Sequence, residues 1–501
     1  MRLAPQQESP PSSPGTQSDE PFHATFLWTA VGLVIAALWI TPMFSSLWND
    51  ELGTWWVING SVHDAVARAE DVQGQSPLYY LIAWAVRHVT GPSEVGLRLP
   101  SLVFLLVAAF VVYRIAKRLV DAETARIAVI AFAVWPSIAF AASDARPYAL
   151  ATLVVVGSTW ALIGWLDTGR LRAAAGYIVL ATLMPYVHPV FGVVLIPQAV
   201  YAFARIAERS TAVRRRDVGL AFLAIAVLAI PIALELLTLW GRREVSSLPR
   251  TATVPWVAEV LVPPAFVGAA VIGGSLTAAT LRIGSDVRRL PRSTLLLLVS
   301  WLLIPTAILV GLSVAWSIDL LEARYLLCMA PAGVLLAAAA TRALEPPKVR
   351  RIIVLIVVLL SVLDLAGPVK SGDFRGAAAL VRTVADARSV ILVPSGFQES
   401  LDPSWFRDPE RRGLLTAGTS FYPVPGTVVP LPIELDAATL DLVRTQVGTG
   451  IGETNNVVVV TRTGSAYGPW FDEYLGERGW TSHDVGGVDR FTVTEFTRDG
   501  T

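Results

Sequence analysis

Two adjacent carboxylates, Asp50 and Glu51, stand in the run LWNDELGTWWV, directly after an apolar stretch that could form a membrane helix. A third carboxylate, Asp144, lies in SDARPYAL two positions before Arg146. A carboxylate exposed at a membrane surface can act as a general base, and an arginine can bind two oxygens of a phosphate. Two alternatives are a pair of solvated carboxylates at a helix end and a surface Asp–Arg ion pair of about 1 kcal/mol or less.

Three further residues with polar side chains lie at the ends of apolar segments. His188 lies in PYVHPVFG, and Arg324 and Tyr325 follow Glu322 in the run LLEARYLL. The two arginines, Arg146 and Arg324, are candidates for binding a phosphate, with His188 as a third positive group. The alternatives are a packed, hydrogen-bonded histidine and an arginine that reaches from the membrane to water.

The composition indicates that these residues belong to an integral membrane protein. The 501 residues are 53% hydrophobic and 16% charged, and the mean hydropathy is +0.56. Soluble proteins contain about 25% charged residues, so the sequence excludes both a soluble multidomain enzyme and a disordered protein. Lys and Arg balance Asp and Glu at 40 each, which gives no indication of nucleic-acid binding. The single cysteine, Cys328, excludes a disulfide framework and a cysteine-based zinc site.

A helix needs about 20 apolar residues to cross a membrane. Eleven segments are predicted to do so: 26–44, 99–116, 124–142, 148–166, 171–187, 189–206, 218–239, 260–280, 294–315, 324–341 and 351–367. The apolar stretch 77–90 is short and contains Arg87 and His88, so we expect it to lie along the membrane interface.

The distribution of Lys and Arg predicts the orientation, because cytoplasmic loops collect these residues. With the N-terminus inside and 77–90 at the interface, most Lys and Arg before residue 368 fall on the cytoplasmic side of a plasma-membrane protein. Treating 77–90 as a span would place the arginine clusters outside. In the favoured orientation Asp50, Asp144, His188 and Arg324 all reach the external face, although they are distant in the sequence.

The regions outside the spans differ in composition. Residues 1–25 are rich in Pro, Gln and Ser and predict a disordered cytoplasmic tail. The membrane region, 26–367, includes a first external loop, 45–98, in which 62–70 has the spacing of an amphipathic helix. After residue 368, helical stretches at 372–387, 435–447 and 468–480 precede strand-like runs at 389–395, 457–460 and 491–496. This alternation predicts a small extracytoplasmic α/β domain over 368–501.

Several motifs resemble those of polytopic glycosyltransferases of the GT-C type. The sequence looks closest to bacterial relatives of the protein O-mannosyltransferases and of the lipid A aminoarabinose transferases. The matching segments are the Asp50–Glu51 pair, QSPLYYLIAW at 75–84, RLPSLVF at 98–104, SDARPYAL at 143–150, HPVFG at 188–192, ARYLLCMAPAG at 323–333 and GDFRGAAA at 372–379. The resemblance implies an α-helical polytopic membrane protein of about eleven spans with a small C-terminal extracytoplasmic α/β domain.

The resemblance also implies an activity. Such enzymes transfer a sugar, for example a hexose such as mannose, from a polyprenyl-phosphate carrier to a hydroxyl group outside the cytoplasmic membrane, usually with inversion. The acceptor would be a glycolipid, a polysaccharide or a protein.

Each matching residue has an implied role. Asp50 matches the catalytic base, Glu51 follows it as in the family pattern, and Asp144 matches a second acid. Arg324 and Tyr325 match a region facing the carrier phosphate. The residues that shape the first external loop are Pro77, Tyr79 and Tyr80. The sequence departs from many relatives at Gln75-Ser76-Pro77, where they carry His-Pro or Pro-Pro.

This chemistry requires no cofactor or metal, although Asp50, Glu51 and Asp144 could hold a hard divalent cation through oxygen. Two other classes of protein are alternatives to an enzyme. A transporter or flippase for lipid-linked sugars typically has internal repeats and polar groups near the bilayer midplane, whereas the charges here lie at span ends. A noncatalytic membrane scaffold would keep the fold and bind partners through its external domain.

Overall fold

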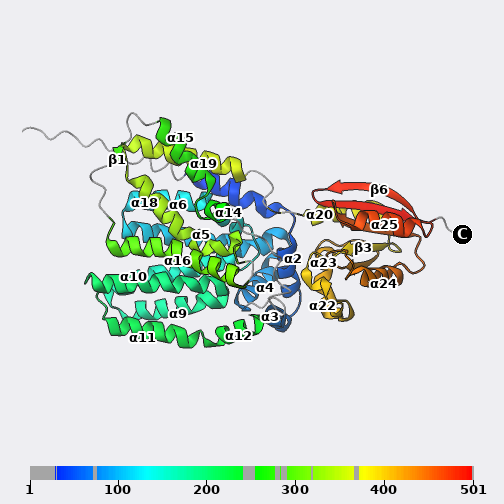
Figure 1. Cartoon of the computed structure of the whole chain (residues 1–501), viewed down its shortest axis with the longest axis horizontal. Coiled ribbons are helices and arrows are strands. Elements are labelled where there is room, and N and C mark those ends of the chain that lie inside the picture. Colours follow the sequence, from blue (N-terminus) through cyan, green and yellow to red (C-terminus); the bar gives the residue numbers. More distant parts are fainter. Residues whose placement is uncertain are drawn as a thin grey trace, which may run out of the picture.

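A helical region and a C-terminal α/β region make up the computed structural model (Figure 1). The structure describes residues 29, 31–71, 76–240, 254–276, 282–283, 290–316, 320–365, 370 and 372–498. We use "helical region" for residues 31–365 and "C-terminal α/β region" for residues 372–498. The tail predicted at 1–25 and the residue Gln75 lie outside the described residues.

The first apolar helix bends just before the two adjacent carboxylates. It runs over Val31–Phe44 and ends in the π-helical segment η1 (Ala36–Ile40) and the 3-10 helix η2 (Thr41–Phe44). Helix α2 (Asn49–Ile58) follows at an angle of 67°. Pro42 in η2 provides no backbone N–H for a helical hydrogen bond. At the start of α2 the Glu51 carboxylate accepts a hydrogen bond from the backbone N–H of Trp48 at 3.3 Å, which satisfies a donor at the helix end.

Two short helices follow α2, as the sequence predicted. In α3 (Val62–Asp71) the side chains of Ser61 and Asp64 each accept a backbone N–H of the other residue, at 3.2 and 2.8 Å, and so cap the helix. Helix α4 (Leu78–Thr90) begins after Pro77 and stops at Gly91, whose φ of +76° suits glycine.

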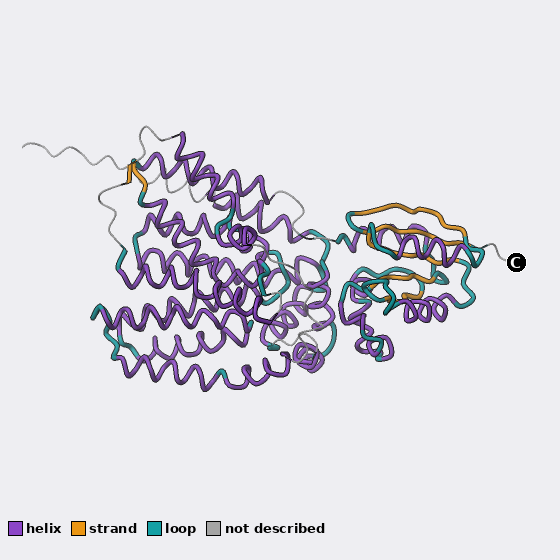
Figure 2. Tube along the Cα trace, in the orientation of Figure 1, coloured by secondary structure: helices purple, strands orange, loops and turns teal. Residues whose placement is uncertain are grey.

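The remaining helices of the helical region follow α4 in the chain, and Figure 2 shows several of them side by side. They are α5 (Glu94–Leu119), α6 (Ala122–Val134), α7 (Pro136–Ala142), α8 (Tyr148–Thr168), α9 (Leu171–Val187), η3 (Pro189–Val194), α10 (Leu195–Ala207), α11 (Arg215–Leu228), α12 (Ile230–Trp240), α14 (Val254–Leu261), α15 (Pro264–Leu276), α16 (Arg292–Trp316), α17 (Ala323–Leu326), η4 (Leu327–Met329), α18 (Ala330–Arg342) and α19 (Pro347–Leu365). A two-residue pairing joins β1 (Arg282–Ile283) to β2 (Leu344–Glu345).

Within the described residues, five helices are long and apolar enough to cross a membrane, or eight if each bent pair is one span. Two of the predicted spans are bent pairs: 124–142 bends by 67° between α6 and α7, and 218–239 bends by 44° between α11 and α12. Pro136 and Pro231 stand at these two breaks, where each removes a helical N–H donor. The multi-pass character is confirmed, and the count of eleven spans stays a prediction.

The C-terminal α/β region contains one five-stranded sheet in the order β4–β3–β5–β7–β6. Strands β4, β3 and β5 are parallel, and β7 is antiparallel to both β5 and β6. The strands are β3 (Val390–Pro394), β4 (Thr427–Leu431), β5 (Asn456–Arg462), β6 (Thr481–Val488) and β7 (Phe491–Thr497). The strands expected at 389–395, 457–460 and 491–496 are therefore present, while β4 and β6 were not expected.

Alternating side chains of the sheet face helices on both sides, which makes three layers. Val390 and Leu392 of β3 pack in one core with α24 (Leu440–Ile451) and α25 (Tyr467–Gly476). Ile391 packs in the other core with α20 (Phe374–Val384). Helices α22 (Pro409–Leu415) and α23 (Ala417–Phe421) contact α2 of the helical region. They follow the short helices η5 (Gln398–Leu401) and α21 (Ser404–Arg407).

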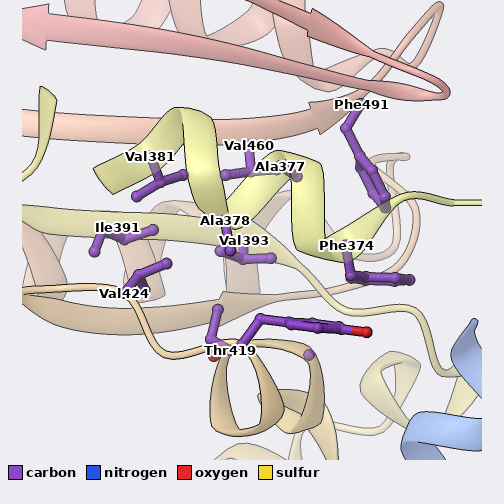
Figure 3. A pocket seen from close by; sticks show the side chains of 12 residues that line it. Phe374, Ala377, Ala378, Val381, Ile391, Val393, Thr419, Val424, Val460 and Phe491 are labelled. Atoms are coloured by element: carbon purple, nitrogen blue, oxygen red, sulfur yellow. The ribbon is translucent and has the colours of Figure 1, made fainter. Parts of the chain in front are cut away.

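A pocket of about 30 Å³ lies between α20, the sheet and α23 (Figure 3). Its lining is mostly apolar and includes Phe374, Val381, Ile391 and Phe491. A pocket for a sugar or lipid headgroup needs a volume of several hundred Å³ and convergent polar groups. This pocket is therefore a packing gap, and the candidate site is found elsewhere.

Candidate active site

Asp50 and Arg324 form an ion pair, although they are 274 positions apart in the sequence. Asp50 lies in the first turn of α2, and Arg324 comes from the four-residue helix α17. Arg324 also forms an ion pair with Glu322. The side chains of Asp50 and Arg324 are 26% and 24% exposed, so this pair is accessible from solvent.

Arg146 adds a second guanidinium beside this pair. It lies in the turn between α7 and α8, is buried, and donates a hydrogen bond from Nη1 to the Tyr80 hydroxyl at 3.4 Å. Burial lowers its pKa, but Tyr80 and Asp50 outweigh burial and hold the pKa of Arg146 above its usual value. The guanidinium is therefore charged. We call Asp50, Glu322, Arg324, Arg146 and Tyr80 the Asp50 cluster.

Aromatic rings surround His188 at the junction of α9 and η3. Its ring lies 5.2 Å from Tyr148, 5.4 Å from Phe191 and 5.4 Å from Tyr325, measured between ring centroids. Burial lowers the pKa of His188 to about 3, and the charges of Arg146 and Arg324 act in the same direction. His188 is therefore neutral at physiological pH, and the positive charge here comes from the arginines.

Glu51 has a different environment from its neighbour Asp50. Its side chain is fully buried and accepts two hydrogen bonds from Arg98, Nε to Oε1 at 2.7 Å and Nη2 to Oε2 at 2.5 Å. Lys370 Nζ lies 2.7 Å from Oε1, and the backbone N–H of Ala145 donates to the same oxygen at 3.0 Å. Both carboxylate oxygens of Glu51 thus accept hydrogen bonds from other residues of the protein.

Arg98 also holds the bend before α2. Its Nη1 donates to the backbone carbonyls of Pro42 and Met43 at 3.0 Å each and of Ser45 at 2.7 Å. Arg98 stands in the run RLPSLVF, and its sequence position alone predicted no role for it. One feature of the sequence could have indicated this role: Arg98 is a charged residue beside an apolar span, and a buried charge must have a partner.

Asp144 is buried beside Glu51. Its Oδ1 accepts a hydrogen bond from Trp48 Nε1 at 3.0 Å and lies 3.7 Å from Lys370 Nζ, while Oδ2 is buried and accepts no hydrogen bond from the described residues. Burial and, to a smaller extent, the charge of Glu51 raise the pKa of Asp144 to about 6, against the opposing charge of Lys370. We call Glu51, Arg98, Asp144, Lys370 and Trp48 the Glu51 cluster.

The structure brings the sequence-predicted carboxylates and arginines into these two adjoining clusters. Tyr325 stacks near Arg324, whose guanidinium carbon lies 5.3 Å from the ring centroid. Pro77 stands at the start of α4, and the buried side chains of Tyr79 and Tyr80 follow it.

The three carboxylates that could hold a cation are not grouped as metal ligands among the described residues, and the possible divalent cation stays a prediction. In the part of the chain that the structure describes, no group of three or more His, Cys, Asp or Glu side chains is arranged to hold a metal ion. Asp50, Glu51 and Asp144 fall outside such an arrangement because Arg98 and Lys370 occupy the oxygens of Glu51.

The C-terminal α/β region contacts the same bend. Gly396 accepts a hydrogen bond from Asn49 Nδ2 at 3.1 Å, next to Asp50. The Tyr422 hydroxyl accepts the backbone N–H of Leu47 at 2.8 Å and donates to Glu94 at 3.1 Å. These contacts place the region directly against the start of α2.

Comparison with known proteins gives a family match over part of the chain. A family model described as "Dolichyl-phosphate-mannose-protein mannosyltransferase" matches residues 74–234. This range contains Tyr80, Asp144, Arg146 and His188, whereas Asp50 and Arg324 lie outside it. A search of curated proteins gave no significant match.

Solved structures match nearly the whole chain. ArnT from Cupriavidus metallidurans in the apo state is 12% identical, with a TM-score of 0.56 over 95% of this chain and 98% of that chain. The same protein bound to undecaprenyl phosphate is 11% identical, with a TM-score of 0.52 over 94% and 98%. The archaeal oligosaccharyltransferase AglB from Archaeoglobus fulgidus, in complex with an inhibitory peptide and a dolichol-phosphate, is 11% identical, with a TM-score of 0.50 over 89% and 70%.

These similarities define the class of the protein by its fold. The chain has the GT-C fold of polytopic membrane glycosyltransferases, and the resemblance seen in its motifs is confirmed. Within that class, the similarity to ArnT includes the C-terminal α/β region, because it extends over 95% of this chain.

Proposed function

We propose that this protein is a membrane glycosyltransferase that moves a sugar from a polyprenyl-phosphate carrier to a hydroxyl acceptor at the outer face of the cytoplasmic membrane. The observation that carries this proposal is the accessible Asp50–Arg324 pair with the charged Arg146 beside it. The undecaprenyl phosphate bound to ArnT and the dolichol-phosphate bound to AglB support a lipid phosphate as the carrier. The family description favours a hexose such as mannose.

The two guanidinium groups would bind the carrier phosphate. In the absence of donor, Arg324 is held by Asp50 and Glu322. A phosphate that approaches Arg324 and Arg146 would compete with Asp50 for the Arg324 guanidinium. Donor binding thereby releases the Asp50 carboxylate, and it puts positive charge where the leaving phosphate becomes more negative.

Asp50 would then act as the general base. It accepts the proton of the acceptor hydroxyl while the hydroxyl oxygen forms a bond to the anomeric carbon. The bond between that carbon and the phosphate oxygen breaks, and its electron pair leaves with the polyprenyl phosphate. Attack from the face opposite the phosphate inverts the configuration of the sugar.

The neighbouring residues would position these groups. Glu51 fixes the first turn of α2 through Arg98, because its oxygens are already engaged. His188 and Tyr325 supply a neutral, largely aromatic wall next to the Arg324 guanidinium. Helices α3 and α4 of the first external loop would exclude water, so that sugar transfer is faster than donor hydrolysis.

The test of this proposal is Asp50→Asn in vesicles supplied with radiolabelled polyprenyl-phosphate mannose and a mixture of envelope glycolipid, polysaccharide and peptide acceptors. We expect transfer to fall by about 100-fold or more, because a positioned general base contributes a factor of this size. Donor binding should persist, since Arg146 and Arg324 remain. Asp472→Asn, at an exposed carboxylate of α25, is the matched control and should retain wild-type activity.

Two results would contradict the proposal. Wild-type transfer rates in Asp50→Asn would remove Asp50 as the base. Movement of labelled donor across the vesicle membrane by the wild-type protein, with no glycosylated product, would identify a flippase instead.

A further inference from the structure

Lys370 enters the Glu51 cluster from the segment just before the C-terminal α/β region. Its ammonium lies 2.7 Å from Glu51 Oε1 and 3.7 Å from Asp144 Oδ1, and it donates to the backbone carbonyl of Ser143. It also lies 5.5 Å from the centroid of the Phe140 ring. The side chain is only 3% exposed, so it is not positioned to bind a substrate in solution.

The charges in this cluster balance. Glu51 and Asp144 are the two carboxylates, and Arg98 and Lys370 are the two cations that contact or face them. Removal of one partner from a buried set of charges leaves another charge without compensation, which is strongly unfavourable. Arg98 pairs with Glu51 through two hydrogen bonds, whereas Lys370 bridges both carboxylates.

The segments joined by Lys370 are those that carry the proposed base and one proposed phosphate ligand. Glu51 is next to Asp50 in the first turn of α2. Ser143 and Asp144 lie in the turn that carries Arg146, where the Arg146 N–H donates to the Asp144 carbonyl at 2.8 Å. A change at Lys370 would therefore move Asp50 and Arg146 relative to each other.

We propose that Lys370 is a positioning residue, through which the C-terminal segment sets the spacing between Asp50 and Arg146. This inference rests on the proposed glycosyltransferase function. Lys370 touches neither substrate in this scheme and acts through Glu51 and Asp144.

Other contacts keep the C-terminal α/β region attached when Lys370 is changed. Arg375 pairs with Glu94 at 3.2 Å, and Tyr422 bonds to both Leu47 and Glu94. These anchors join the C-terminal α/β region to the bend before α2 and to the start of α5, and they do not involve Lys370. The consequence of replacing Lys370 should accordingly be local to the Glu51 cluster.

The kinetic test compares Lys370→Met with Lys348→Met, which changes an exposed lysine in the first turn of α19. We expect Lys370→Met to lower kcat by about 100-fold, as a small misplacement of reacting groups can do. The KM for the polyprenyl-phosphate sugar should change much less, because Arg324 and Arg146 remain. Lys370→Arg keeps the positive charge and should recover part of kcat, whereas Lys348→Met should match the wild type. An unchanged kcat in Lys370→Met would overturn the inference.

A second measurement does not depend on activity. Thermal unfolding at pH 8 should show a lower Tm for Lys370→Met than for the wild type. Adding Asp144→Asn to Lys370→Met should raise the Tm again, because one uncompensated carboxylate is removed while the Glu51–Arg98 pair stays intact. A double variant no more stable than Lys370→Met would refute the charge network even if the wild-type protein shows no transfer. Absence of transfer in the wild type with the expected Tm pattern would refute the proposed function alone.

Discussion

The side chains of the candidate site differ in how their charge is neutralised. Asp50 and Arg324 pair with both side chains partly exposed, where a ligand phosphate can compete for the arginine. Glu51 and Arg98 pair with both side chains fully buried, where no ligand can replace either partner. One residue of the adjacent Asp50–Glu51 pair is therefore suited to chemistry and the other to holding the helix start.

Asp144 should make stability depend on pH. Its pKa is raised from an ordinary value of 3.8 to about 6, chiefly by burial, so the folded protein keeps a proton that the unfolded chain loses. The stability that this proton provides is present below about pH 4 and is lost as the pH rises through 6. Glu51, Arg98, Lys370 and Arg146, which face Asp144, set its pKa.

In Asp144→Asn we expect this loss of Tm between pH 4 and 6 to disappear, because asparagine does not titrate. The measurement is the Tm of the wild type and of Asp144→Asn, determined by thermal unfolding in detergent at intervals from pH 4 to 8. Identical pH profiles for the variant and the wild type would show that Asp144 titrates alike in the folded and unfolded states.

Arg324→Ala should weaken use of the lipid donor. Loss of a charge-assisted contact to phosphate corresponds to a rise in the KM for the donor of about 10- to 100-fold. Initial rates over a range of donor concentrations measure this, and Arg407→Ala, at an exposed arginine of α21, is the control. If the donor KM of Arg324→Ala matched that of the control, Arg324 would be a structural anchor.

At the scale of the elements, the bends of the helices set where the polar turns lie. Helix α6 ends at Val134, just before Trp135, and α7 follows at an angle of 67° and leads to Ser143 and Asp144. The Trp135 ring packs on α18 at Gly333, where a Cβ atom would lie only 2.7 Å from the ring. Glycine is therefore required for this close approach of α18 to the bend.

Gly333→Ala should destabilise the protein by about 1–3 kcal/mol, because the added methyl group overpacks this contact. Gly311→Ala in α16 adds the same methyl group where no atom lies within 4 Å, and it should leave stability unchanged or raised. Thermal unfolding of the two variants in detergent compares them directly. Equal Tm values would mean that the Trp135 ring can shift without cost.

At the scale of the whole molecule, the C-terminal α/β region lies at the end of the helical region where α2 is found (Figure 1). Contacts such as Asn49 to Gly396 and Trp55 to Phe421 join the two. If the Arg-rich loops are cytoplasmic, the Asp50 cluster and the C-terminal α/β region share the external side.

Labelling of single cysteines tests this orientation. Cys328 is the only cysteine of the sequence and is fully buried, so it should give little background. We expect a membrane-impermeant maleimide added to intact cells to label Ser482→Cys on β6. Thr168→Cys at the end of α8 should react only after the cells are permeabilised. The reverse pattern would place the candidate site in the cytoplasm.

Local sequence properties determined many of the helices and strands of this protein. The length of each apolar run predicted helices such as α5, α8 and α16, and the short run at 77–90 predicted α4. Alternation of helical and strand-like runs predicted β3, β5 and β7. Residue types at span ends also indicated Asp50 and Arg324 as candidates, because ionisable groups are rare and costly there, and the structure pairs these two residues.

Only the tertiary structure decided how those charges pair and how the spans bend. Glu51 binds Arg98, 47 positions away, and Lys370, 319 positions away, and neither separation leaves a periodic signal in the sequence. Pairing depends on the distance between side chains after the helices pack, and hydropathy records only whether a segment is apolar. The difference between Asp50 and Glu51 therefore arises from packing, since the two residues are neighbours with the same charge.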